Sequence, residues 1–169
     1  ITYGTTPELK VKVEGFIGEE TAVTASGYIA PMVENENINA GEYELTPTGG
    51  KADNYEFEYV SGILKIQKVQ GAGNVTIEDW TYGENPSTPN VTSTTNGIEN
   101  VTYSYSGKTL ENVEFGPSEN VPTQAGNYTV TATFAATTNY NEVKAIADFK
   151  ISKAKVEEPT VNTGLTYTG

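Results

Sequence analysis

The feature that most limits how this chain can fold is an internal repeat that covers nearly its whole length. Tyr3-Gly4-Thr5-Thr6-Pro7 recurs as Tyr82-Gly83-Glu84-Asn85-Pro86, and Ala40-Gly41-Glu42-Tyr43 recurs as Ala125-Gly126-Asn127-Tyr128. The two motifs lie farther apart in the second copy than in the first. This difference predicts an insertion between them in the second copy, in a region where loop length varies easily.

Two further landmarks keep the spacing of the Ala-Gly-x-Tyr motifs. Asn54-Tyr55 returns as Asn139-Tyr140, and Leu64-Lys65-Ile66-Gln67-Lys68 returns as Phe149-Lys150-Ile151-Ser152-Lys153. A third copy starts at Leu165-Thr166-Tyr167. Four landmarks in the same order indicate repeated domains rather than chance.

The repeat predicts three segments. Residues 1–70 form a first repeat that lacks its first strand, 71–154 form a second repeat, and 155–169 supply the first strand of a third. We hypothesise that the tail, residues 156–163, fills the vacant edge of the first repeat in a neighbouring molecule by strand addition.

Alternating apolar and polar residues predict that the repeats are built from strands. Tyr128 to Phe134 alternates with threonines, Leu9 to Val13 alternates with charged residues, and Tyr55 to Tyr59 alternates with glutamates. This period of two is typical of half-buried antiparallel strands. Val75 to Asp79 is a further predicted strand. No window shows a helical apolar period, so we predict an all-β fold with no helix beyond a single turn.

Three aromatic residues are predicted to be structural. Tyr43 and Tyr128 each precede a core position by two residues, as does the tyrosine corner of immunoglobulin-like sandwiches, whose hydroxyl bonds back to the backbone. The alternative is that both rings simply alternate into the core. Trp80, next to the second Tyr-Gly motif, is predicted to pack against the neighbouring sheet.

Taken together, the motifs resemble the MBG-type bacterial immunoglobulin-like repeats. The resemblance rests on the Tyr-Gly-x-x-Pro opening, the Ala-Gly-x-Tyr strand, the Asn-Tyr loop and the closing apolar-Lys-Ile-x-Lys strand. It implies two tandem immunoglobulin-like β-sandwich domains within a large exported surface protein or adhesin. Tyr167-Thr168-Gly169 departs from the Tyr-Gly pattern. The family offers no catalytic residues to carry over.

Composition excludes several kinds of function. The chain has ten lysines, no arginine, histidine or cysteine, and 22 acidic residues, which gives a formal net charge of −12. Such a charge repels nucleic acids and anionic membranes. No imidazole base, thiolate or usual zinc ligand exists. The carboxylate pairs Glu19 with Glu20, Glu34 with Glu36, and Glu78 with Asp79 indicate a solvated acidic face rather than a glycosidase cleft. We therefore predict no enzymatic activity and no cofactor.

Two weaker binding hypotheses remain. Calcium could bind near the predicted domain joints through Glu78, Asp79, Glu157 and Glu158, because carboxylate oxygens suit this ion. Neutral sugars could stack on Tyr28, Tyr103 and Tyr105, which lie in the variable half of each repeat. The loop from Thr88 to Asn100 is left without a structural role.

The sequence thus favours a stalk or spacer of a bacterial cell-surface or cell-wall protein. Its expected partners are neighbouring repeats of the same chain, with a host glycan or protein as a further possibility. Neither nucleic-acid binding nor membrane insertion is expected. The alternatives are an adhesin module that binds a host glycan or protein, and an accessory domain of a secreted carbohydrate-active enzyme.

Overall fold

The computed structural model describes residues 1–158, and this part of the chain is all-β. It contains eleven strands, and no residue in it is helical, so no helix there could cross a membrane. Contacts divide the chain into two units. Unit 1 is Ile1–Gly71 together with Ala136–Glu142, and unit 2 is Ala72–Ala135 together with the described residues from Val143 to 158.

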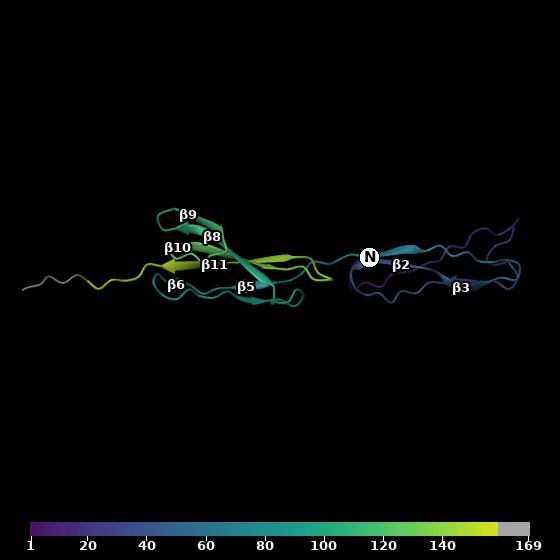
Figure 1. Cartoon of the computed structure of the whole chain (residues 1–169), viewed down its shortest axis with the longest axis horizontal. Coiled ribbons are helices and arrows are strands. Elements are labelled where there is room, and N and C mark those ends of the chain that lie inside the picture. The colour runs from purple at the N-terminus through teal and green to yellow at the C-terminus, as the bar shows by residue number, and fades with distance from the viewer. Residues whose placement is uncertain (159–169) are drawn as a thin grey trace, which may run out of the picture. The chain divides into compact units, whose positions relative to one another are not determined.

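Unit 2 is built on a five-stranded sheet. The strand order is β6-β11-β10-β8-β9, and β8, β10 and β11 lie side by side (Figure 1). The strands are β6 (Trp80–Thr81), β8 (Val101–Thr109), β9 (Glu114–Ser118), β10 (Gly126–Phe134) and β11 (Val143–Ser152). The prediction for Tyr128 to Phe134 is confirmed, because the apolar residues of β10 are buried and the threonines between them are half-buried.

A two-stranded ribbon packs against this sheet in unit 2. It consists of β5 (Asn74–Thr76) and β7 (Asn90–Thr92), which are antiparallel. Val75 of β5 belongs to the same buried cluster as Val130, Phe134 and Ile151 of the large sheet, and those three side chains have no exposed surface. The ribbon therefore covers one side of an apolar core.

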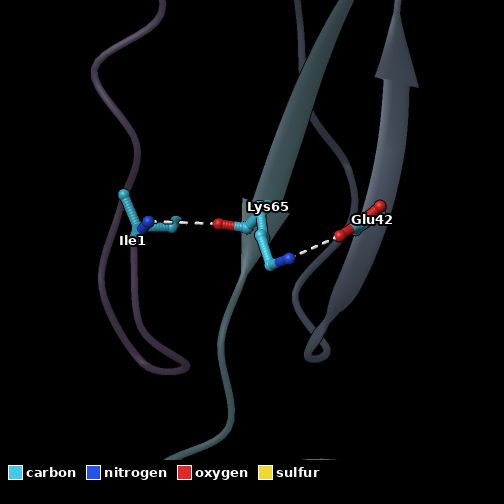
Figure 2. Close-up of polar contacts among 3 residues, drawn as sticks. All are labelled: Ile1, Glu42 and Lys65. Carbon is cyan, nitrogen blue, oxygen red and sulfur yellow. Dashed lines mark hydrogen bonds and ion pairs between the residues drawn. The ribbon is translucent and has the colours of Figure 1, made fainter.

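Unit 1 contains two separate strand pairs in its described part. The pairs are β1 (Ile29–Met32) with β3 (Thr48–Lys51), and β2 (Gly41–Leu45) with β4 (Gly62–Ile66). Leu64 and Ile66 of β4 point inward and are buried. On the other side of the same strands, Lys65 donates a 2.6 Å hydrogen bond to Glu42, and the Ile1 amino group donates to the Lys65 carbonyl at 3.1 Å (Figure 2). The bond raises the pKa of Lys65 and lowers that of Glu42.

The corresponding ladders of the two units have the same register. In unit 1 Gly41 lies opposite Ile66 and Tyr43 lies opposite Leu64. In unit 2 the residues at the matching repeat positions make the same pairs, Gly126 with Ile151 and Tyr128 with Phe149. The repeated motifs therefore occupy equivalent places in two antiparallel ladders.

Three predicted strands differ from the structure. Residues 9–13 and 55–59 alternate as expected between half-buried and exposed, apart from Tyr59, but neither segment belongs to a strand. The pattern predicted which side chains face inward, and it did not predict backbone pairing. The third, predicted over 75–79, is confirmed only in part, because β5 ends at Thr76 and residues 77–79 belong to no strand. Asp79 Oδ1 accepts a 2.6 Å hydrogen bond from the Lys150 amide.

The predicted tail strand lies mostly outside the described residues. Residues 153–158 form no strand, and Val156 is exposed. Strand addition through residues 156–163 thus remains a hypothesis.

Candidate functional site

Each unit has a Tyr-Gly turn whose glycine adopts a conformation that other residues rarely take. Thr5 N–H donates to the Thr2 carbonyl at 3.1 Å, and Glu84 N–H donates to the Thr81 carbonyl at 3.0 Å. The third residue of each turn is glycine, with φ of 84° at Gly4 and 90° at Gly83. A positive φ at this position is typical of a type II turn, which explains why both motifs contain glycine.

The strand that leads into this turn pairs in parallel with the last strand of the unit. In unit 2, β6 pairs with β11, and Tyr82 N–H donates to the Ser152 carbonyl at 2.8 Å. In unit 1, Thr2 forms a parallel bridge with Gln67, and Tyr3 N–H donates to the Gln67 carbonyl at 2.8 Å. In both units the backbone just before the Tyr-Gly turn is thus joined to the end of the last ladder by equivalent hydrogen bonds.

Both Ala-Gly-x-Tyr motifs form a tyrosine corner. Tyr43 Oη donates to the Asn39 carbonyl, and Tyr128 Oη donates to the Gln124 carbonyl, each at 2.9 Å. The ring folds back over the glycine, so that a Cβ on Gly41 would lie 2.9 Å from Tyr43 Oη and one on Gly126 would lie 2.7 Å from Tyr128 Oη. Glycine is therefore required for the tyrosine hydroxyl to reach the backbone four residues earlier.

The end of unit 1 that carries these motifs holds residues 136–142, which we call the Asn-Tyr segment. Val69 N–H donates to the Asn139 carbonyl at 3.0 Å, and Asn141 N–H donates to the Val69 carbonyl at 2.9 Å. Val69 and Tyr140 thereby form a parallel bridge. The backbone of the segment is held by both hydrogen-bonding groups of one residue.

Side chains add specific contacts to the Asn-Tyr segment. Asn139 Oδ1 accepts from Ala40 N–H at 2.8 Å, and Asn139 Nδ2 donates to Asn39 Oδ1 at 3.0 Å. Lys68 Nζ donates to the Thr137 carbonyl at 2.6 Å. The rings of Tyr3 and Tyr140 meet edge to face, with centroids 5.6 Å apart. This end of unit 1 therefore recognises both the asparagine and the tyrosine.

In the sequence, Asn139-Tyr140 is only a repeated landmark, and its repetition is the one signal that these residues have a role.

Unit 1 also contains a groove lined with aromatic rings. Its cavity of about 390 Å³ is lined by Phe16, Tyr55, Phe57 and Tyr59, among others. The Tyr55 hydroxyl donates to the Glu20 carboxylate, which raises the tyrosine pKa, and it accepts from Ile17 N–H at 3.1 Å. Aromatic faces beside carboxylates can contact a neutral sugar.

The three tyrosines predicted to stack on sugars lie in different environments. Tyr28 is half-buried between Phe16 and Phe57, at ring distances of 5.9 and 6.3 Å. Tyr103 is half-buried on β8. Tyr105 is only 3% exposed, and its burial raises the pKa of its hydroxyl. A sugar-stacking role for Tyr105 is incompatible with this position, because its ring packs edge to face on Phe149 inside the core.

The structure does not bring the predicted calcium ligands together. Glu78, Glu157 and Glu158 are exposed, and Asp79 uses Oδ1 to bind the Lys150 amide. Within residues 1–158, no group of three acidic side chains is placed to hold a metal ion. The predicted loop from Thr88 to Asn100 is partly a strand, because Asn90–Thr92 forms β7. In the rest of it, the Asn96 side chain donates to the Ala135 carbonyl at 2.8 Å, which anchors the segment within unit 2.

Trp80 is a buried packing residue, but it stacks on a neighbouring strand of its own sheet and not on the neighbouring sheet that was predicted. It is 7% exposed and stacks on Phe149 with a centroid distance of 4.9 Å. The contact joins β6 to β11, next to the parallel hydrogen bonds between these strands.

Comparison with known proteins identifies the first repeat. Residues 1–65 match the MBG domain family of the YGX type. This range contains Tyr3-Gly4-Thr5. The suspected MBG-type resemblance is confirmed over these residues. No curated protein and no solved structure matches the chain.

Proposed function

We propose that this chain is a non-catalytic, load-bearing spacer of an exported bacterial surface protein, formed by two immunoglobulin-like repeats in series. The match of the first repeat to the MBG domain supports a repeat of this kind. The matching register of β2–β4 and β10–β11 supports extending the same fold to the second repeat.

The observation that carries the proposal is the parallel pairing, in each unit, of the backbone just before the Tyr-Gly turn with the end of the last ladder. In unit 2 the chain passes from β5 into β6, which runs in the same direction as the last strand, β11, and is hydrogen-bonded to it. Tension that reaches β6 is carried across these bonds to β11. Pulling the chain ends apart slides these strands past each other, so the bonds between them are loaded together rather than one after another. Thr2 and Gln67 have the same arrangement in unit 1. A unit joined in this way is suited to transmit force.

The exterior also suits a spacer. The net charge of −12 and the many threonines keep the chain hydrated and discourage association with other acidic surfaces. Mixed exposed pairs, such as Lys108 with Glu114 on neighbouring strands, contribute little stability but keep the surface polar.

The test is single-molecule force spectroscopy on the full chain, held by its two ends. Opening unit 2, together with release of residues 136–142 from unit 1, frees the chain between Thr81 and Ser152. Opening unit 1 frees the somewhat shorter chain between Thr2 and Gln67. At a maximum of about 3.5 Å per residue, we expect two force peaks with length gains of roughly 250 and 230 Å.

Tyr82→Pro tests whether the parallel bonds carry the load. Proline removes the N–H that donates to Ser152, while proline suits the second position of a type II turn and the extended Thr81 before it. We expect a lower rupture force for the longer opening step only. Thr129→Val is the control, because it removes a 2.6 Å bond to Asp148 elsewhere in the sheet. An unchanged force for Tyr82→Pro would contradict the proposal.

The aromatic groove of unit 1 favours a second candidate, an adhesin module that binds a host glycan or protein. Its rings include Tyr59, which is 38% exposed. A glycan and extracellular-matrix array probed with the full chain, with and without calcium, separates the two functions. Specific binding that Tyr59→Ala removes would favour the adhesin. The remaining alternative, an accessory domain of a secreted carbohydrate-active enzyme, would show polysaccharide binding instead.

A further inference from the structure

Unit 2 has an open cavity at the end that corresponds to the segment-binding end of unit 1. The cavity has a volume of about 570 Å³. Five of its lining residues occupy the repeat positions that hold the Asn-Tyr segment in unit 1: Tyr82, Gln124, Ala125, Lys153 and Ala154. The repeat therefore places the same set of groups around this cavity.

The correspondence preserves the chemistry of each contact. Tyr82, Ala125 and Lys153 are identical to Tyr3, Ala40 and Lys68. Gln124 replaces Asn39 and also has a side-chain amide. Ala154 replaces Val69 and has the same backbone N–H and carbonyl groups, which in Val69 form the parallel bridge. None of the substitutions removes a hydrogen-bonding group that binds the segment in unit 1.

We propose that this cavity of unit 2 binds the Asn-Tyr segment of another repeat of the same type. Ala154 forms the parallel bridge, and Lys153 binds a segment carbonyl. Ala125 and Gln124 recognise the asparagine side chain, while the Tyr82 ring contacts the segment tyrosine. The inference rests on the proposed function, because it assumes that repeats of this kind act in series. It names the partner that this cavity binds.

The ring of Tyr82 is available for such a contact. It is 49% exposed, whereas Tyr3, which contacts Tyr140 in unit 1, is half-buried. Tyr82 donates its backbone N–H to Ser152, so its position is fixed although its ring is uncovered. An exposed ring on a fixed backbone is a suitable surface for a second tyrosine.

The cavity of unit 2 also has an apolar wall that comes from the longer half of its repeat. Leu110 and Val113 line it and are 43% and 58% exposed. Leu110 N–H donates to the Ala125 carbonyl at 3.0 Å, which fixes this wall beside the segment-binding residues. The wall gives the site additional apolar surface that a bound segment would cover.

The probe is a cyclic peptide of residues 134–143, since Phe134 and Val143 face each other as the last pair of the β10–β11 ladder. The ¹⁵N-labelled full chain is titrated with this peptide and followed by NMR. We expect saturable shifts at the amides of Gln124, Ala125, Lys153 and Ala154. A peptide with Asn139→Ala loses two hydrogen bonds, so its affinity should fall by a factor of about ten or more.

Variants of the chain test the assigned roles. Ala154→Pro removes the N–H of the bridging residue and should abolish the shifts. Lys153→Ala should weaken binding, and the matched control Lys155→Ala should not, because Lys155 does not line the cavity.

Three results would overturn the proposal. They are no saturable shift at millimolar peptide, shifts confined to the surroundings of Tyr3 and Val69, and equal binding by the Asn139→Ala peptide. Each of these can occur while the two force peaks and the effect of Tyr82→Pro persist. Failure of this inference is therefore distinguishable from failure of the proposed function.

Discussion

Replacing Tyr128 by phenylalanine isolates the energy of the tyrosine corner. The substitution removes the 2.9 Å hydrogen bond from Tyr128 Oη to the Gln124 carbonyl. It keeps the ring, which is 3% exposed and contacts Phe115 and Phe149 at centroid distances of 5.7 Å. The change therefore separates the hydroxyl from the apolar packing.

We expect Tyr128→Phe to lower the free energy of unfolding of unit 2 by about 1.5 kcal/mol, the upper part of the range for one hydrogen bond. Tyr128→Ala also removes the ring contacts and should cost roughly 3 kcal/mol or more. The two variants should thus differ by the contribution of the ring.

Urea unfolding followed by tryptophan fluorescence measures this difference. Trp80 is the only tryptophan of the chain and stacks on Phe149, so its emission reports on unit 2. Tyr103→Phe is the control, since it makes the same chemical change on β8 of the same sheet. If Tyr128→Phe unfolds at the same urea concentration as the parent, the corner does not stabilise the unit and the reasoning fails.

Two other predictions concern the same unit. Gly126→Ala should lower the free energy of unfolding of unit 2 by about 2–3 kcal/mol, because its Cβ would lie 2.3 Å from the Lys108 carbonyl oxygen. An unchanged urea midpoint for unit 2 would disprove this. Gly62→Ala, in β4 of unit 1, introduces a Cβ that meets nothing within 4 Å and should not destabilise unit 1. Burial raises the pKa of Tyr105 and Tyr128 above the ordinary 10.0, so stability should be constant below about pH 10 and fall above it, as the unfolded chain loses these protons first. Urea unfolding followed by circular dichroism at each pH measures this stability. A fall in the free energy of unfolding between pH 7 and 9 that disappears when Tyr105 and Tyr128 are replaced by phenylalanine would contradict the prediction.

Motif repetition predicted much of the fold because it reflects backbone constraints. The Tyr-Gly turn needs a positive φ at Gly4 and Gly83, and the corner needs glycine at positions 41 and 126. Such requirements fix the residue type at particular positions, so they can be recognised in the sequence. Alternation predicted the inward faces for the same reason, since one side of β10 lies against the core.

Which backbone segments pair with one another was harder to predict from the sequence. Residues 9–13 alternate like a strand, yet their backbone joins no ladder in the structure. The hydrogen bond from the Lys150 amide to Asp79 Oδ1 could not be foreseen, because it depends on the position of Lys150, which is distant in the sequence. Alternation reports burial, whereas pairing depends on distant segments.

The candidate sites show the same distinction. The position of Tyr105 in the variable half of its repeat predicts a sugar contact, yet the residue lies on β8 with its ring in the core. The variable half of a repeat suggested exposure, but variation in loop length does not predict the direction of a side chain on a strand. Conversely, the repeated Asn139-Tyr140 had a contact role that only the placement of Val69 and Asn39 revealed.

Dependence of the rupture force on pulling direction tests the load-bearing account most directly. The chain has no cysteine, so cysteines introduced at Thr102 and Thr133 give unique attachment points. These residues face each other near one end of the antiparallel β8–β10 ladder, so force applied between them opens that ladder one pair at a time. The account predicts a lower rupture force for unit 2 in this direction than between the chain ends. Equal forces in both directions would contradict it.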